Sequence, residues 1–213
     1  MKVQYKKKFK IAHGHRIQLG ISESEVQESD VFTADDMDKT FIISDTHFFH
    51  RNKKYKDAIK VYCDRPDDWF NQVINHWKRT VREDDTVIHL GDLTLGNKKE
   101  TEQLTNILPG DKYLIKGNHD RHGVGWFKDV HFKRIKHFYV NIGEWNIVFS
   151  HRPVYIMPEK TINIHGHWHT GSAFMSNVGN WVHVNCCVEQ IGYKVLKLTD
   201  ILQMIRDKYG IRL

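Results

Sequence analysis

The sequence predicts an α/β fold, and three observations lead to this prediction. In the first half of the chain, short apolar runs alternate with helical segments, which is typical of parallel strands connected by helices. The second half contains mainly strand-like runs. Most predicted strands end in Asp, Asn or His, and ligand sites of open α/β sheets form at the carboxyl ends of strands. We therefore expect these polar side chains to meet at one place.

Three apolar runs in the first half have the length and composition of buried strands: residues 41–43, 86–88 and 113–115. Between them, apolar residues spaced three or four positions apart predict a helix over 67–81, which Asp67 or Asp68 can cap. A second, polar helix is expected over 98–107, where Pro109 and Gly110 follow as a stop signal.

The second half is predicted to be rich in strands: residues 138–142, 145–150, 161–164, 181–188 and 193–198. The first two are expected to pair across a turn at Gly143. A last helix is predicted over 200–209, with Gly210 as its C-terminal stop.

Length and composition fit one globular domain preceded by an extension. The 213 residues suffice for one sizeable core, and 40% hydrophobic with 27% charged residues is ordinary for a soluble protein. Residues 1–38 differ from the rest, because they are rich in Lys, Ser, Glu and Asp and show little apolar periodicity. We therefore expect an N-terminal extension over 1–38, with short strands within 3–11, and one domain over 39–213.

The sequence also bears on the cellular compartment. No apolar run approaches the roughly 18 residues of a membrane helix, so no membrane partner is expected. The lysine-rich start lacks the apolar core of a secretory signal. Three cysteines, two of them adjacent, imply no disulfide framework. A reducing, cytoplasmic setting is the expectation.

Charge and histidine content indicate what the chain binds. The formal net charge of +6 mildly favours an anionic partner. Histidine accounts for 15 of the 213 residues, and many histidines stand beside Asp, Asn or Gly. Because neutral imidazole and carboxylate are common ligands of transition metals, this composition indicates a metal site.

The potential ligands gather in five blocks, which follow one another as Asp45-Thr46-His47, Gly91-Asp92, Gly117-Asn118-His119-Asp120, His151 and Gly166-His167-Trp168-His169. In an extended chain, side chains two positions apart point the same way, so an Asp-x-His or His-x-His pair can reach one ion. The two oxygens of an Asp can bridge two ions. Taken alone, the first three blocks also fit ordinary caps and turns, since Asn, Asp and Gly are turn residues.

The five blocks in this order resemble the calcineurin-like metallophosphoesterase superfamily over about residues 40–198. The segments 62–66 and 184–194 further resemble small bacterial and bacteriophage members, whereas residues 1–38 show no such resemblance. The resemblance implies a four-layered α/β/β/α sandwich of two mixed sheets flanked by helices, with the site on loops at one edge. It also implies hydrolysis of phosphate esters.

The resemblance implies the metal ligands residue by residue. A first ion is expected on Asp45, His47 and His169. A second is expected on Asn118, His151 and His167, with Asp92 as the bridge. Nitrogen and oxygen ligands without thiolate suit Mn²⁺, Fe²⁺ or Zn²⁺, and also admit Ni²⁺. We expect two divalent ions, with Mn²⁺ as the first choice.

Further residues are expected to act on the substrate. His119 is the candidate general acid, in agreement with the resemblance, and Asp120 is expected to orient or charge-tune its ring. Candidate substrate contacts are His50, Arg65 and Arg152. For the two arginines, the reason is that a guanidinium fork fits phosphate oxygens. For each of these three, a surface or structural role is an open alternative.

The leading prediction is a phosphodiesterase that acts on a nucleotide or nucleic-acid ester through a metal-activated water. A phosphomonoesterase for a small phosphorylated metabolite or nucleotide is the nearest alternative, because the metal motif is common to both. A non-catalytic metal-binding scaffold is the distant alternative, and the intact set of ligands and general acid counts against it.

Overall fold

The computed structural model describes residues 27–28, 34–154, 157–170, 174–178 and 181–213. The strands expected within 3–11, and most of the extension expected over 1–38, therefore lie outside the described residues.

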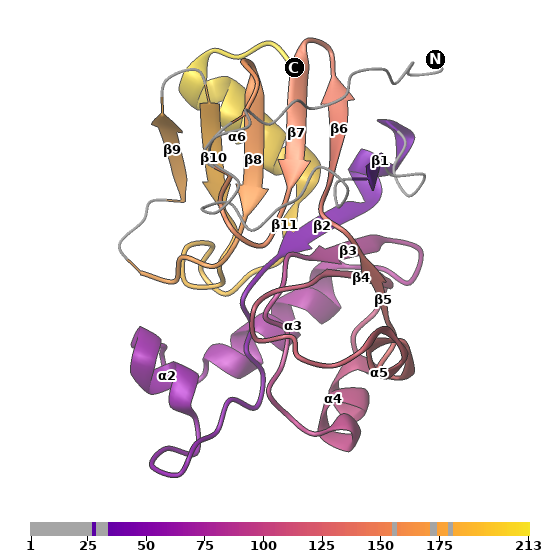
Figure 1. Cartoon of the computed structure of the whole chain (residues 1–213), viewed down its shortest axis with the longest axis vertical. Coiled ribbons are helices and arrows are strands. Elements are labelled where there is room, and N and C mark those ends of the chain that lie inside the picture. The colour runs from indigo at the N-terminus through magenta and orange to yellow at the C-terminus, as the bar shows by residue number, and fades with distance from the viewer. Residues whose placement is uncertain (1–26, 29–33, 155–156, 171–173, 179–180) are drawn as a thin grey trace.

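A five-stranded mixed sheet occupies one half of the described chain (Figure 1). Its strands, in spatial order, are β11 (Leu196–Lys197), β2 (Thr40–Ile43), β3 (Thr86–His89), β4 (Asp111–Ile115) and β5 (Phe132–Ile135). Strands β2 to β5 are parallel, and β11 runs antiparallel to β2. Ile43 pairs with His89, which pairs with Leu114, so three parallel strands end at one level. The loops after them start from the same edge of the sheet.

A six-stranded mixed sheet forms the other half. Its order is β1 (Gln27–Glu28), β6 (Phe138–Ile142), β7 (Trp145–Phe149), β8 (Thr161–His165), β10 (Trp181–Asn185) and β9 (Met175–Val178). Strands β6 and β7 pair antiparallel across Gly143, as predicted. Strands β7, β8 and β10 are parallel, and Phe149, Ile164 and Val184 lie at one level across them. Their carboxyl ends also share an edge.

The helices are α2 (Ala58–Cys63), α3 (Trp69–Thr80), α4 (Lys98–Thr105), α5 (Val124–Asp129) and α6 (Leu198–Tyr209), and a 3₁₀ helix, η2 (Ala34–Lys39), precedes β2. Because side chains alternate along a strand, β2 serves two cores. Phe41 and Ile43 pack toward Trp77 of α3, while Ile42 packs toward the six-stranded sheet and Ile201 of α6. Figure 1 shows α6 (yellow) beside the six-stranded sheet. Two mixed sheets flanked by helices confirm the predicted fold class.

The predicted helices are found with small shifts of their ends. Helix α4 begins at a capping box between Asn97 and Glu100, and Gly210 takes the left-handed conformation that ends α6. The strand expected over 193–198 is wrong at both ends, because only Leu196–Lys197 are strand and Leu198 already belongs to the buried face of α6. The strand expected over 181–188 ends at Asn185. The short elements α2, α5, β5 and β9 were not predicted, since four to six residues hold too little periodicity.

Candidate active site

The carboxyl edges of the two sheets meet, and this contact brings the five blocks together. Ser44, directly after β2, bridges to Cys187, which follows β10. The Asp45 N–H donates to the Gly91 carbonyl at 2.9 Å, so the loops after β2 and β3 run side by side. The Gly166 N–H donates to the His151 carbonyl at 2.9 Å, which joins the loops after β8 and β7.

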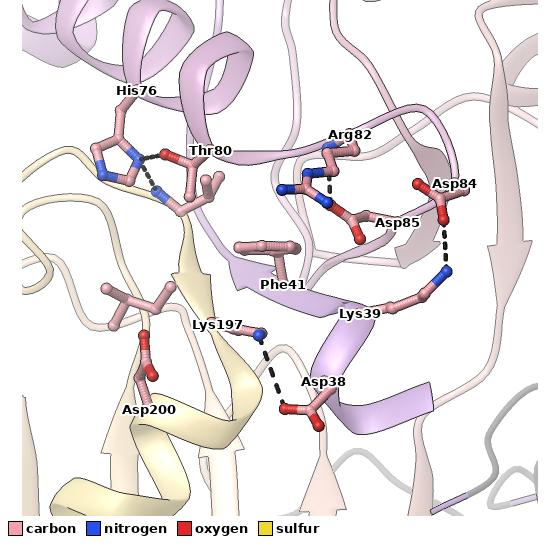
Figure 2. A pocket seen from close by; sticks show the side chains of 12 residues that line it. Asp38, Lys39, Phe41, His76, Thr80, Arg82, Asp84, Asp85, Lys197 and Asp200 are labelled. Carbon is pink, nitrogen blue, oxygen red and sulfur yellow. Dashed lines mark hydrogen bonds and ion pairs between the residues drawn. The ribbon is translucent and has the colours of Figure 1, made fainter. Parts of the chain in front are cut away.

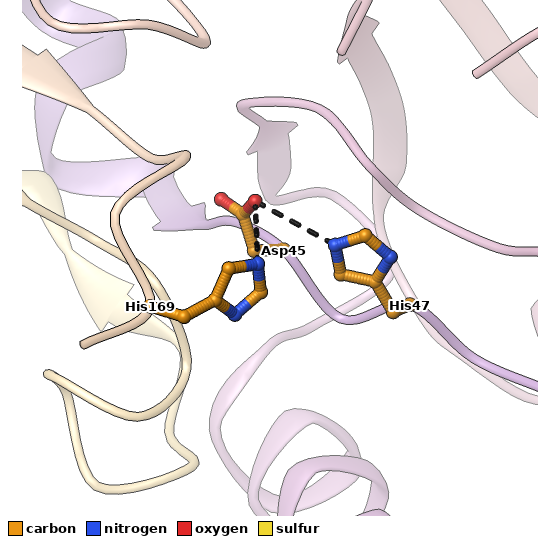
Figure 3. Close-up of side chains that lie close together, drawn as sticks. All are labelled: Asp45, His47 and His169. Carbon is orange, nitrogen blue, oxygen red and sulfur yellow. Dashed lines mark ion pairs between the residues drawn. The ribbon is translucent and has the colours of Figure 1, made fainter. Parts of the chain in front are cut away.

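Asp45, His47 and His169 form the first group of candidate ligands (Figure 3). Asp45 Oδ1 lies 3.4 Å from His169 Nε2 and 3.8 Å from His47 Nε2. Metal–ligand bonds of about 2.0–2.2 Å place neighbouring ligand atoms about 3–3.6 Å apart. Asp45 Oδ1 and His47 Nε2 are buried and accept or donate no hydrogen bond within the described residues. Buried oxygen and nitrogen atoms without a hydrogen-bond partner are suited to bind a divalent cation.

Asp92, His151 and His167 form the second group. Asp92 Oδ2 lies 3.5 Å from His151 Nε2, and the Asn118 amide oxygen lies 3.0 Å from the same nitrogen. The rings of His151 and His167 meet edge to face at 5.1 Å. Asp92 Oδ2 also lies 3.4 Å from His47 Nε2 in the first group. One carboxylate therefore touches both groups.

Hydrogen bonds fix the tautomers of two of these imidazoles. His151 Nδ1 lies 3.0 Å from the Leu90 carbonyl, an acceptor only, so this nitrogen carries the proton. His169 Nδ1 lies 2.9 Å from Glu189 Oε1 and donates to it. In both rings the Nε2 atom then faces the neighbouring carboxylate. A backing acceptor of this kind also raises the basicity of a metal-binding imidazole.

Several of the candidate ligands lie on left-handed backbone. Asp45, His47, Asp92 and His167 all have positive φ, between 47° and 72°. Non-glycine residues adopt this region at a cost, and such residues gather at functional sites. The extended geometry that the sequence suggested for Asp-x-His and His-x-His is therefore wrong. In His167-Trp168-His169, for example, the two histidines belong to different groups of candidate ligands.

Three glycines permit the close approach of these loops. Gly91 has a φ of 110°. A Cβ on Gly117 would lie 2.1 Å from Asp92 Oδ1, and a Cβ on Gly166 would lie 2.1 Å from Asp45 Oδ2. Gly117 and Gly166 are thus required by space, whereas Gly91 is required by its conformation as well.

Asp120 acts on the backbone of the site. Its carboxylate accepts the N–H groups of Asp92 at 2.7 Å, Gly117 at 2.8 Å and Leu93 at 3.0 Å. Within the described residues, the Asp120 carboxylate forms no hydrogen bond with the His119 ring, so its observed role is to hold the backbone of the site, and the expected charge tuning of His119 stays a prediction. His119 itself donates its backbone N–H to Asp92 Oδ1 at 2.7 Å. Its partly exposed ring lies 5.1 Å from the His47 ring, edge on.

The three candidate substrate contacts differ in exposure. Arg65 is buried, and its guanidinium donates to the Asp45 carbonyl at 2.8 Å, the Thr46 carbonyl at 2.7 Å and Glu189 at 2.7–2.8 Å. Arg65 therefore holds the loop of the first group, and the expected phosphate contact does not fit this position. Arg152 is exposed. The His50 ring stacks at 5.8 Å on the His47 ring.

Burial and charge set the protonation of the first group. Burial lowers the pKa of His47 to about 4. Burial by itself raises the pKa of Asp45, but contacts with His169 and His47 outweigh it and hold this pKa well below the usual value. Burial likewise lowers the pKa of His169, yet contacts with Asp45, Cys63 and Glu189 raise it to about 12. A proton on His169 thus stands where a cation would bind, and metal binding releases such protons.

Burial raises the pKa of Asp92 to about 6, and the nearby His151 opposes this rise. Burial also lowers the pKa of His167 to about 4, so its ring is neutral at pH 7. A neutral imidazole offers a lone pair, and a bound cation favours the ionised form of a neighbouring carboxyl. The second group therefore also fits a divalent cation.

Two supporting residues were missed from the sequence. Glu189 links His169 to Arg65. His89, fully buried, contacts the Thr46 hydroxyl at 3.0 Å and accepts the Gly91 N–H at 3.2 Å. No sequence pattern pointed to Glu189, because it stands alone 20 residues after His169. His89 had one weak signal, since it directly follows the strand predicted over 86–88.

A separate hollow of about 520 Å³ lies away from these groups (Figure 2). It is lined mainly by charged side chains around Phe41, at the amino ends of β2 and β3. Several of these charges pair with one another, including Lys39 with Asp84 and Lys197 with Asp38. No predicted site residue lines this hollow.

Comparisons with known proteins agree with this geometry. Residues 39–186 match the model of the calcineurin-like phosphoesterase superfamily domain. An uncharacterized protein of Methanocaldococcus jannaschii is 31% identical over 188 residues, which cover 83% of this chain and 96% of that protein. Within the described residues, no helix is long and apolar enough to cross a membrane.

Solved structures are similar as well. A protein of unknown function from Aquifex aeolicus superposes with a TM-score of 0.58 and 24% identity, over 78% of this chain and 98% of that one. A phosphoesterase from E. coli superposes with a TM-score of 0.42 and 15% identity, over 68% of this chain and 77% of that one. On the match of residues 39–186, this chain belongs to the calcineurin-like phosphoesterase superfamily of metal-dependent hydrolases.

Proposed function

We propose that this chain is a phosphodiesterase that uses two divalent metal ions and acts on a nucleotide or nucleic-acid ester. One observation carries the proposal: Asp92 Oδ2 lies 3.4 Å from His47 Nε2 and 3.5 Å from His151 Nε2. A carboxylate between two sets of imidazole and carboxylate donors suits a pair of ions about 3.5–4 Å apart.

In this proposal, each group of candidate ligands holds one ion. Asp45, His47 and His169 hold the first. His151, His167 and the amide oxygen of Asn118 hold the second, and Asp92 bridges. Mn²⁺ is our first choice, because the donors are nitrogen and oxygen only, and Fe²⁺, Zn²⁺ or Ni²⁺ suit the same donors.

The chemistry divides between the ions and the protein. When bound, two divalent cations neutralise phosphate charge and lower the pKa of a water that attacks phosphorus. The chain supplies the proton for the departing alkoxide from His119, whose partly exposed ring stands beside His47. The bond from the His119 backbone N–H to Asp92 Oδ1 holds the backbone of His119 beside the Asp92 carboxylate. The exposure of Arg152, next to His151, supports the proposal that its guanidinium contacts phosphate.

The test is the hydrolysis of bis(p-nitrophenyl) phosphate and p-nitrophenyl phosphate, measured side by side with Mn²⁺. We expect faster turnover of the diester. His119→Ala should lower kcat about 10²–10⁴-fold, the usual range for general acid catalysis, while the bound metal stays unchanged. His122→Ala, in the same loop region, is the matched control and should keep full activity.

The other outcomes are equally informative. A preference for the monoester would replace the proposal with a phosphomonoesterase. Two bound ions without hydrolysis of either ester or of an oligonucleotide would favour a scaffold and contradict the proposed activity.

A further inference from the structure

We propose that residues 51–57, here called the basic loop, form with helix α2 a docking surface for single-stranded nucleic acid next to the candidate metal ligands. The inference rests on the proposed function, since it extends the substrate from a single ester to a nucleic-acid strand. Figure 1 shows α2 and the chain before it projecting away from the two sheets.

The basic loop concentrates positive charge. Its exposed cations are Arg51, Lys53, Lys54 and Lys56. Arg51 pairs with Glu100 at 2.7 Å, whereas the three lysines form no ion pair with any residue that the structure describes. Asp57, the only acid of the loop, turns inward and accepts from the Lys60 N–H at 3.2 Å and from Trp69 Nε1 at 2.9 Å. The lysines are therefore available to phosphates.

Exposed aromatic surface lies beside these cations. The Tyr62 side chain on α2 is 59% exposed. Its ring lies 6.2 Å from the Tyr55 ring, and Lys54 Nζ lies 5.0 Å from the Tyr55 ring centre. Proteins that bind single strands combine cations along the backbone with aromatic faces on which bases stack. A run of charged residues that contacts only solvent would not need an exposed aromatic ring beside it.

The surface is held in a defined shape. The Asn52 side-chain oxygen accepts the N–H groups of Lys54 at 2.9 Å and Tyr55 at 2.7 Å, and its amide donates to the Tyr62 hydroxyl at 2.6 Å. The Ala58 N–H donates to the His50 carbonyl at 2.6 Å. One asparagine thus closes the loop and fixes the Tyr62 ring, which lowers the entropy lost on binding.

A row of rings connects this surface to the candidate active site. The Tyr62 ring lies 5.9 Å from the His50 ring, which lies 5.8 Å from the His47 ring. A base stacked on Tyr62 would place a neighbouring phosphate near His47. Single strands are favoured over duplexes, because only unpaired bases offer a free face for stacking.

The experiment measures fluorescence anisotropy of a labelled phosphorothioate oligothymidylate of about 12 nucleotides, a length within the usual site size. The full chain is used with Mn²⁺. The charge variant is K53Q/K54Q/K56Q, and its matched control is K78Q/K99Q/K128Q, three exposed lysines on α3, α4 and α5. The stacking variant is Tyr62→Leu, which keeps an apolar side chain and removes the ring.

We expect the charge variant to weaken binding at least about tenfold and to reduce the salt slope by about 2, since each phosphate contact on single strands contributes about 0.7. Tyr62→Leu should weaken binding about 5- to 100-fold. The control should change affinity less than the charge variant at equal net charge. All variants should hydrolyse bis(p-nitrophenyl) phosphate at the wild-type rate.

Three results would overturn the inference. If the charge variant and its control lose the same affinity for the oligonucleotide, the loss comes from net charge alone. A duplex bound as tightly as the single strand, with no effect of Tyr62→Leu, would exclude stacking. Heparin bound more tightly than the oligonucleotide through the same lysines would make the surface a general polyanion site. Absence of bis(p-nitrophenyl) phosphate hydrolysis in the wild type would instead count against the proposed function.

Discussion

The two groups of candidate ligands differ in how the fold supports them. In the first group, Asp45 and His47 are buried, and His169 is backed by Glu189, which is itself paired with Arg65. In the second group, His151 is backed by a neutral backbone carbonyl, and Asn118 is exposed. A charged acceptor raises imidazole basicity more than a neutral one does. We therefore expect the first group to retain an ion more tightly than the second.

The largest effect is expected where the two groups meet. Asp92→Asn keeps the size of the side chain but removes the negative charge between them. We expect one bound Mn²⁺ per chain in place of two, and a loss of turnover of about 10³-fold or more, because each cation stabilises the transition state by several kcal/mol. Metal analysis of the purified protein and diester hydrolysis measure the two changes.

Asp129→Asn, an exposed carboxylate on α5, is the matched control and should change neither quantity. Two retained ions with full turnover in Asp92→Asn would break the proposed link between the groups.

Removing the support of the first group should have a smaller and selective effect. Glu189→Gln leaves a neutral partner for His169, so we expect the tighter Mn²⁺ to bind about 10–100-fold more weakly. Asn118→Ala should weaken only the second binding step. Isothermal titration calorimetry separates the steps, with Glu159→Gln on the surface as the control. If Glu189→Gln instead weakens the second step, the order of affinities is reversed.

The next effect, on the stability of the fold, is expected from the close packing of Gly117 against Asp92. Gly117→Ala places a Cβ 2.1 Å from Asp92 Oδ1, so we expect a loss of about 1–3 kcal/mol in the free energy of unfolding, the usual cost of overpacking. Gly125→Ala meets nothing within 4 Å and lies in α5, where Ala is favoured over Gly. Urea unfolding of the two variants makes the comparison. Equal stability would show that the Asp92 loop yields easily.

The last effect concerns pH and the support of the Asp45 loop. Burial lowers the pKa of His89 to about 3, below its value of 6.5 in the unfolded chain. Between pH 6.5 and 3 the unfolded chain therefore binds a proton that the folded chain excludes, and stability falls as pH falls, by at most about 1.4 kcal/mol per pH unit.

In metal-free protein, His89→Gln should reduce this slope, as measured by urea unfolding at several pH values. A slope equal to that of the wild type would mean that His89 gains its proton in the folded state as well.

Much of the site followed from local sequence. Asp45, His47, Asp92 and His151 each stand at or just after a buried strand, and parallel strands end at one edge. Polar residues that follow parallel strands of one sheet therefore gather at one edge, whereas His151 follows a strand of the second sheet and joins them only because the two edges meet. The spacing of apolar residues likewise determined α3, and Gly210 determined the end of α6.

Other features were decided only by tertiary structure. Left-handed backbone at Asp45 and His47 depends on contacts between loops, so side-chain direction did not follow from an extended chain. Arg65, expected at the substrate, is buried under the first group by its bonds to the Asp45 loop and Glu189.

By itself, then, the sequence determined most of the strands and the candidate ligands that follow them, because hydrophobic periodicity is a local property. The tertiary structure decided which atoms face each other and that Glu189 supports His169. Those outcomes depend on contacts between segments far apart in the chain, and no local pattern encodes the distances of such contacts.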